Sequence, residues 1–339
     1  MPPHLSNFLL LWYHLDMAHD TTSTVIFYAL LKLFFISLAG YLSVQRGFIK
    51  AQTIDGISRF IITISLPALI ISTLGTNLHH HLLGELALCF AAAFVLNILG
   101  ITIAYFFRWT ALPRGRRDRG LFLSLSAFQN SGYLPIPLAA AVLPKELLPF
   151  GLLLIFVYML VMGLIFWSAG IWLITEGSAR DWRENMRKTA NPPIITLLLG
   201  LLFLWSPVRE GFQSLPALQD SLDLIGNTTI PLVMFVLGGS LRDQTLIKSS
   251  GGIVAGISSL VKLLAIPACA LLAVRFIPMD RTFAFVLVLQ AAMPAALNHI
   301  VVARKYGGNV PLTARTLLVQ YLLSLATIPF FLFQLEQMR

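Results

Sequence analysis

Only 12% of the 339 residues are charged and 57% are hydrophobic, with a mean hydropathy of +0.80. Soluble domains average about 25% charged and roughly 45–50% apolar residues, so the composition excludes a soluble protein and indicates an all-α polytopic membrane protein. The net charge of +9 does not indicate nucleic-acid binding, because the lysines and arginines lie in short loops between apolar runs. Cys89 and Cys269 lie inside apolar runs, as packing residues do.

Ten apolar runs are predicted to be transmembrane helices, since a helix needs roughly 20 apolar residues to cross a bilayer. They lie near residues 24–44, 53–75, 82–107, 120–143, 147–174, 192–207, 219–241, 250–277, 282–303 and 312–335. Residues 1–23 are predicted to form an N-terminal tail. They make a poor signal peptide, because Phe8–Tyr13 has no basic segment before it and no small-residue cleavage site after it. A start of translation at Met17 stays open beside one at Met1.

The loops between these runs differ in charge. Of the 24 basic residues, 17 lie in one set of loops and 5 lie in the other set and the termini, while Lys32 and Lys262 lie inside runs. The positive-inside rule places the basic set in the cytoplasm. The sequence thus predicts a multi-pass protein of the plasma (inner) membrane with both termini on the non-cytoplasmic side.

Two of the runs carry a polar, proline-containing interruption near the middle. The first interruption is Gln129–Pro137 and the second is Gln290–His299. Proline lacks the N–H that bonds four residues back, so Pro135, Pro137 and Pro294 each free a backbone carbonyl. In lipid such a carbonyl costs several kcal/mol unless protein or a water-filled cavity satisfies it. A pair of broken helices in corresponding positions predicts the binding site of a transporter.

A shift of 164 residues relates the two halves of the chain. It lays Leu66-Pro67 on Ile230-Pro231 and Asn130 on Pro294. Each half then holds five runs, and because five is odd, the halves enter the membrane from opposite sides. The predicted organisation is a five-helix repeat over 24–175, a cytoplasmic linker over 176–191, and a second, inverted five-helix repeat over 192–339.

At these residues the chain resembles the auxin efflux carrier family of permeases, including its bacterial members. Asn130–Leu138 resembles the family's Asn-x-Gly-aromatic-x-x-x-Pro crossover motif. Ala291–Asn298, followed by Ala303–Gly307, resembles the second crossover and its exit. The likeness extends from about Thr24 to the C-terminus. Pro135 is a departure, because it adds a proline inside the first motif.

The resemblance implies a secondary carrier of ten helices in two inverted repeats, whose two broken helices cross at the midplane as in bile-acid/sodium symporters. It implies a small organic anion, such as a carboxylate, as substrate and alternating access against a panel formed by the second and seventh helices and their neighbours. Related carriers can pair through panel helices, so a homodimer is compatible with the resemblance, while the sequence leaves the oligomeric state open. A sodium-coupled symporter of the same fold is the alternative, and a channel is less favoured.

Side-chain amides at the two breaks are the first candidates for binding the anion. An amide offers donors and acceptors without a charge, so it can bind a carboxylate or cap an unwound turn. The predicted substrate-binding residues are Asn130, Asn298, Gln129, Gln290, Ser131, His299, Lys262 and Lys32. The predicted helix-breaking residues are Gly132, Pro135, Pro137 and Pro294. The alternative is that the amides only satisfy the interrupted backbone.

Three ionisable residues lie deep in the runs. Lys32 and Lys262 lie near the middle of theirs, and no Asp or Glu is equally deep. A charge there costs at least about 2.5 kcal/mol on insertion scales, and an unpaired cation suits an anionic substrate, although a structural role is the alternative. His299 could carry a proton or only be hydrogen-bonded. Without deep carboxylates, sodium coupling is less favoured than uniport or proton coupling.

Enzyme and metal chemistry find no support in the sequence. An intramembrane protease needs paired aspartates, a Ser–His pair or a metal-binding motif inside spans, and none occurs. His79-His80-His81 lies in a short outer loop without a convergent Cys or carboxylate, so a solvated turn is predicted there rather than a metal site. A channel usually needs repeated pore elements or oligomeric symmetry. We therefore expect a carrier without a cofactor.

Overall fold

The computed structural model describes residues 22–77, 79–109, 115–175, 190–203, 211–212, 214–241, 251–306 and 308–338. The predicted tail, up to residue 21, and the predicted linker, up to residue 189, lie outside these residues. Within them the regular structure is helical throughout, with one isolated antiparallel bridge. This confirms the all-α class.

The helices follow the chain in this order: α2 (Thr22–Gln45), α3 (Ala51–Phe60), η1 (Ile61–Ser65), α4 (Leu66–Asn77), η2 (His80–Leu82), α5 (Leu83–Phe107), α6 (Arg116–Ala127), α7 (Pro135–Val142), α8 (Leu148–Ile165), η3 (Phe166–Gly170), α9 (Ile171–Thr175), α11 (Pro192–Phe203), α13 (Pro216–Asn227), α14 (Thr229–Leu241), α15 (Gly252–Leu260), η4 (Val261–Ala265), α16 (Ile266–Phe276), α17 (Arg281–Ala292), α18 (Asn298–Lys305) and α19 (Val310–Gln337). Three of the connectors, η1, η3 and η4, are π-helical turns that continue one span into the next helix.

Among the described residues, six helical segments are long and apolar enough to cross a membrane. They are Gln52–Asn77, Leu83–Phe107, Leu148–Thr175, Pro216–Ser240, Gly252–Phe276 and Val310–Gln337. Three other predicted runs contain shorter apolar helices, at Leu31–Gln45, Pro192–Phe203 and Arg281–Ala292. The remaining run, 120–143, is divided between α6 and α7.

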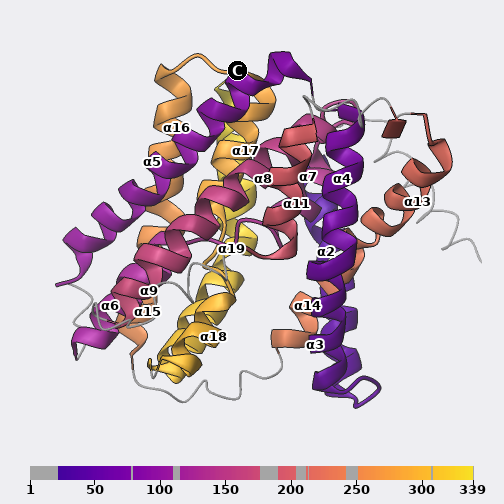
Figure 1. Ribbon diagram of the computed structural model, residues 1–339. Coiled ribbons are helices and arrows are strands. Elements are labelled where there is room, and N and C mark those ends of the chain that lie inside the picture. The colour runs from indigo at the N-terminus through magenta and orange to yellow at the C-terminus, as the bar shows by residue number, and fades with distance from the viewer. Residues whose placement is uncertain are drawn as a thin grey trace, which may run out of the picture.

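The helices form two groups. We call α2, α3, α4, α11, α13 and α14 the panel, because they pack chiefly on one another. Most of the panel lies on the right in Figure 1, whereas α5, α6, α15 and α16 lie on the left. The panel touches the rest of the protein mainly through α7, α8 and α19. Of the two broken spans, the first meets the panel through α7, which packs on α2 and α14.

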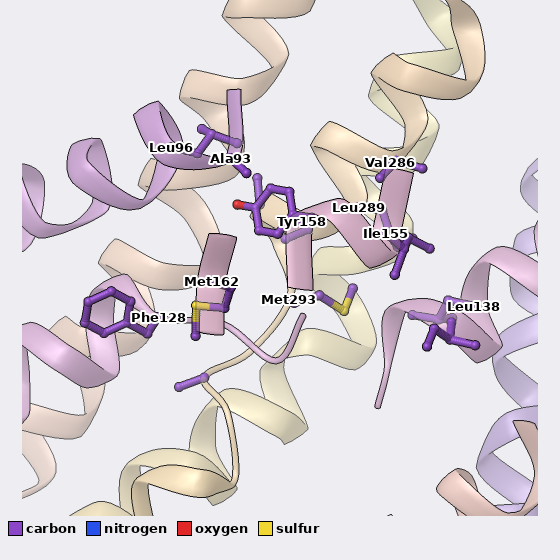
Figure 2. Packing of buried hydrophobic residues seen from close by; sticks show 14 of the residues in the cluster. Ala93, Leu96, Phe128, Leu138, Ile155, Tyr158, Met162, Val286, Leu289 and Met293 are labelled. Carbon is purple, nitrogen blue, oxygen red and sulfur yellow. The ribbon is translucent and has the colours of Figure 1, made fainter. Parts of the chain in front are cut away.

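The buried core surrounds α8 and α17. Every residue from Thr282 to Ala292 of α17 is buried, as is most of α8. Figure 2 shows Tyr158 and Met162 of α8 in one apolar cluster with Leu289 of α17 and Met293, which follows it. This packing holds α17, the first half of the second interrupted span, in the buried core.

Candidate functional site

Both interrupted spans leave the helical conformation at their polar segments. After α6, Phe128 adopts an extended backbone (φ −98°, ψ 113°), and the chain becomes helical again at Pro135. After α17, Met293 is likewise extended (φ −68°, ψ 142°), and α18 begins at Asn298. The first turn of α7 begins at Pro135, where the missing N–H needs no partner. We call 128–134 the first break and 293–297 the second break.

The two breaks pair with each other through their backbones. The Asn130 N–H donates to the Pro294 carbonyl at 2.8 Å, and the Ala296 N–H donates to the Phe128 carbonyl at 3.3 Å. Gln129 and Ala295 form the isolated antiparallel bridge between these hydrogen bonds. Polar backbone groups that would be costly to leave unpaired in a membrane are therefore satisfied by the opposite break.

Side-chain amides fasten the breaks to their surroundings. Gln129 Nε2 donates to the Tyr158 hydroxyl at 2.5 Å, and Asn130 Nδ2 donates to the Tyr321 hydroxyl at 2.9 Å. Gln290 Nε2 donates to the Ser131 carbonyl at 2.9 Å, which links the end of α17 to the first break. These bonds fix where the amides stand.

Gln320 of α19 joins the second break to the end of α6, which leads into the first break. Its Oε1 accepts from the Ala295 N–H at 2.8 Å, and its Nε2 donates to the Leu125 carbonyl at 3.2 Å and to the Ser258 hydroxyl at 3.1 Å. It is fully buried. A buried amide with all these partners is a rigid support, since breaking any of the bonds would leave a polar atom unpaired.

A cavity of about 580 Å³ lies against the paired breaks, between them and the panel. This size suits a small organic ligand. Its polar floor at the breaks comprises Gln129, Asn130, Ser131, Ala296 and Asn298. Its walls are largely apolar and include Ile61, Leu66, Met159, Met162, Phe166, Trp167, Val233 and Val236. Asp55 and Arg304 are the charged residues of the described lining.

The predicted site residues divide between the cavity and its surroundings. Gln129, Asn130, Ser131, Gly132 and Asn298 line the cavity, and Asn298 has an exposed side chain there. The other predicted residues do not line it. Those are Gln290, His299, Lys262, Lys32, Pro135, Pro137 and Pro294.

His299 and the two lysines lie apart from the lining in different ways. His299 is fully buried, with Nε2 at 3.0 Å from the Ser124 hydroxyl and Nδ1 at 2.7 Å from the Ala296 carbonyl. Lys32 is exposed on the surface of α2. Lys262 is buried in η4, with Nζ at 3.3 Å from the Ala291 carbonyl. The hydrogen-bonded interpretation of His299 fits this geometry.

Three functional candidates were absent from the sequence prediction. Tyr158 and Tyr321 hold the amides of the first break, and Gln320 joins the second break to the end of α6. One signal was available for Gln320, since it is an amide in the middle of an apolar run, as Gln290 is. The tyrosines carry no such signal, because tyrosine is common in membrane helices on any face.

Comparison with known proteins places the chain among transporters. A family model described as membrane transport protein matches residues 25–332. An uncharacterised transporter of Methanothermobacter thermautotrophicus is 27% identical over 305 residues, covering 88% of this chain and 95% of the relative. One from Methanocaldococcus jannaschii is 24% identical, covering 86% and 92%. A probable auxin efflux carrier component 9 of Oryza sativa is 30% identical over 125 residues, or 37% of this chain and 29% of that protein.

Proposed function

Because this chain belongs to the membrane transport protein family of auxin efflux carrier-like permeases, we propose that it is a secondary active transporter of small organic anions such as carboxylates. The family and its transporter relatives indicate an integral multi-pass membrane protein and not an enzyme. Alternating access around the paired breaks is the proposed mechanism. The observation that carries the proposal is the amide-lined floor of the cavity at those breaks.

The chemistry of the floor suits a carboxylate. Asn298 starts α18 and lines the cavity, so its side chain stands beside the positive N-terminal end of a half-helix. Pro135 starts α7 directly after the first break, which supplies a second half-helix N-terminus near the floor. Oriented N–H groups and amides bind an anion without a buried fixed charge. The apolar walls would cover the uncharged part of the substrate.

The positions of the helices support the inverted repeat. Shifting Gln52–Asn77 by 164 residues gives 216–241, against the observed Pro216–Ser240. The same shift takes Arg116–Ala127 to 280–291, against Arg281–Ala292, and it takes 148–175 to 312–339, against Val310–Gln337. Ten helices in two five-helix repeats, over 24–175 and 192–339, account for this correspondence.

Direct contacts between matched residues support the same arrangement. The Ser65 hydroxyl lies 2.6 Å from the Thr229 hydroxyl, and these residues are 164 positions apart. Asn130 and Pro294, which share the backbone bond between the breaks, are also 164 positions apart. A residue can touch its own counterpart only near a two-fold axis. We therefore place the pseudo-two-fold axis of the repeat through both contacts.

The cavity also suggests which state of the transport cycle the structure represents. Its lining includes Asp55, Asn191, Ser240 and Arg304, which lie at helix ends next to loops of the basic set. If those loops are cytoplasmic and both termini lie outside, the cavity opens toward the cytoplasm. A reporter fused to the C-terminus that is active only in the cytoplasm should then be silent, and an active reporter would reverse the orientation.

A thermal-shift screen tests the proposed substrate class. A ligand that binds only the folded protein raises its stability by RT ln(1 + [L]/Kd), so an anion of about 1 mM affinity should raise Tm by roughly 2–4 °C at tens of millimolar. The purified protein is screened against mono- and dicarboxylates, indole acids and amino acids, with choline as the only cation. We expect at least one carboxylate to raise Tm.

Two variants locate the binding. Asn298→Ala removes an amide from the floor and should abolish the shift, whereas Lys32→Ala, on the exposed surface of α2, should retain it. Equal shifts in both variants would move the site away from the breaks. A shift that requires added sodium would favour the symporter, and the absence of any anion-dependent shift would argue against an organic anion.

A further inference from the structure

Lys262 points its charge at the backbone of another helix rather than into the cavity. It is 0% exposed, and its Nζ donates to the Ala291 carbonyl of α17 at 3.3 Å. Within the part of the chain that the structure describes, no carboxylate forms an ion pair with it. The neighbours Val261 and Leu263 are buried apolar residues. The ammonium group is therefore matched by a carbonyl and not by an acid.

That carbonyl belongs to the C-terminal end of a broken helix. α17 ends at Ala292, where the second break begins, so the last four carbonyls of α17 have no partner within the helix. Such an end carries the negative pole of the helix dipole, and it lies inside the protein where water cannot screen it. A cation placed there is stabilised by the helix and stabilises it in turn.

At the corresponding end of α6, a different kind of group donates to the free carbonyls. Its Leu125 carbonyl accepts from the neutral amide of Gln320 at 3.2 Å, and its Ser124 carbonyl accepts from the Phe128 N–H at 3.0 Å. No cation of the described residues donates to that end. Among the described residues, the two helix ends thus differ, with a lysine at the end of α17 and a neutral amide at the end of α6.

In carriers with broken helices, the C-terminal ends of half-helices and the unwound carbonyls are where coupling cations bind. We propose that Lys262 places its ammonium group in the position of such a cation at the end of α17. Lys262 is then a positioning residue, which holds the second break without touching the substrate. Its meaning for transport rests on the proposed function: the carrier works without sodium, because the cation is part of the chain.

The local backbone structure explains how Lys262 reaches the end of α17. It lies in the π-helical turn η4, three residues before Ala265, and α16 follows at Ile266 with Pro267 as its second residue. Proline cannot donate a backbone hydrogen bond, and a π-turn accommodates the irregular ladder before it. The wider turn rotates the following residues relative to those before it. The long, apolar stem of lysine then reaches across to α17.

Sodium-dependent stability of charge-removal variants tests the proposal without any knowledge of the substrate. Tm of the purified protein is measured in sodium chloride and in choline chloride at equal ionic strength, for the wild type, Lys262→Ala, Lys262→Arg and Lys32→Ala. We expect Lys262→Ala to have a lower Tm in choline and to regain about 2 °C or more in sodium, because sodium enters the vacated space. The other three should have the same Tm in both salts.

The outcomes distinguish a lysine that takes the place of a bound cation from a lysine that only stabilises the fold. A Lys262→Ala variant that is destabilised equally in both salts would overturn the proposal, as would a wild type that sodium stabilises. If Lys262→Ala does not fold, Lys262→Ser purified in sodium carries the same comparison, and radioactive sodium bound by Lys262→Ser but not by the wild type is the expected result. Anion binding by the wild type is scored separately, so the proposed function can fail while this inference stands.

Discussion

Gly238→Leu is expected to separate α14 from α2 and to lower Tm by roughly 4–6 °C or more. A Cβ at Gly238 would run into the Ser37 carbonyl, and one at Gly40 would run into the Phe235 carbonyl. Both obstacles are backbone atoms, so the substitution cannot be absorbed by a side-chain rotation. Overpacking of a buried contact costs about 3 kcal/mol or more when the backbone must move. The panel would lose its largest interface.

Gly56→Ala is the matched control, because it lies in α3 of the same panel and a Cβ there meets no atom within 4 Å. We expect its Tm to equal or slightly exceed that of the wild type, since alanine favours a helix over glycine. Thermal unfolding of the two purified variants, followed by intrinsic fluorescence, gives the comparison. A Gly238→Leu protein that unfolds with the wild type would show that α2 and α14 do not approach as closely as described.

Asn130→Leu is expected to weaken anion binding by about 10–100-fold. The amide lines the cavity and is held by the Tyr321 hydroxyl at 2.9 Å. A hydrogen bond to a charged group contributes about 1.5–3 kcal/mol, which corresponds to that range of affinity. Leucine keeps the branched shape of the side chain and the backbone N–H that bonds Pro294. The affinity is measured by titrating the carboxylate that gives the largest thermal shift.

Tyr321→Phe tests whether the Asn130 amide binds the substrate or only supports the first break. This variant removes only the hydroxyl that accepts from Asn130, so a purely structural amide predicts that both variants lose the same amount of stability and of affinity. A substrate-contacting amide predicts a smaller loss of affinity in Tyr321→Phe than in Asn130→Leu. Affinity that is unchanged in Asn130→Leu would remove this residue from the site.

The interruption of two spans could be predicted from sequence because it depends on local chemistry. Proline and clustered amides inside an apolar run disturb a helix wherever it lies, and both segments leave the helical conformation. The pairing of the breaks could not be predicted in detail. It depends on contacts between residues 164 positions apart, such as Asn130 with Pro294, and a repeat in the sequence gives their correspondence but not their distance.

The sequence also could not predict whether an individual side chain points toward the lipid or into the protein. Lys32 and Lys262 lie at similar depths in apolar runs, yet one is exposed and the other is fully buried. In a soluble helix the polar face marks the surface, whereas a membrane helix is apolar on the lipid side as well as on the packed side. Depth can therefore be read from the distance to the ends of a run, but rotation about the helix axis cannot.

Exchange of substrate in proteoliposomes tests whether the paired breaks form the binding site of a carrier. Purified protein is reconstituted, and uptake of the radiolabelled carboxylate chosen by the thermal screen is measured with and without the same unlabelled anion inside. We predict saturable uptake that the internal anion accelerates, that persists in choline, and that Asn130→Leu reduces. Uptake that rises linearly with concentration and is unaffected by the internal anion would contradict a carrier and indicate a channel.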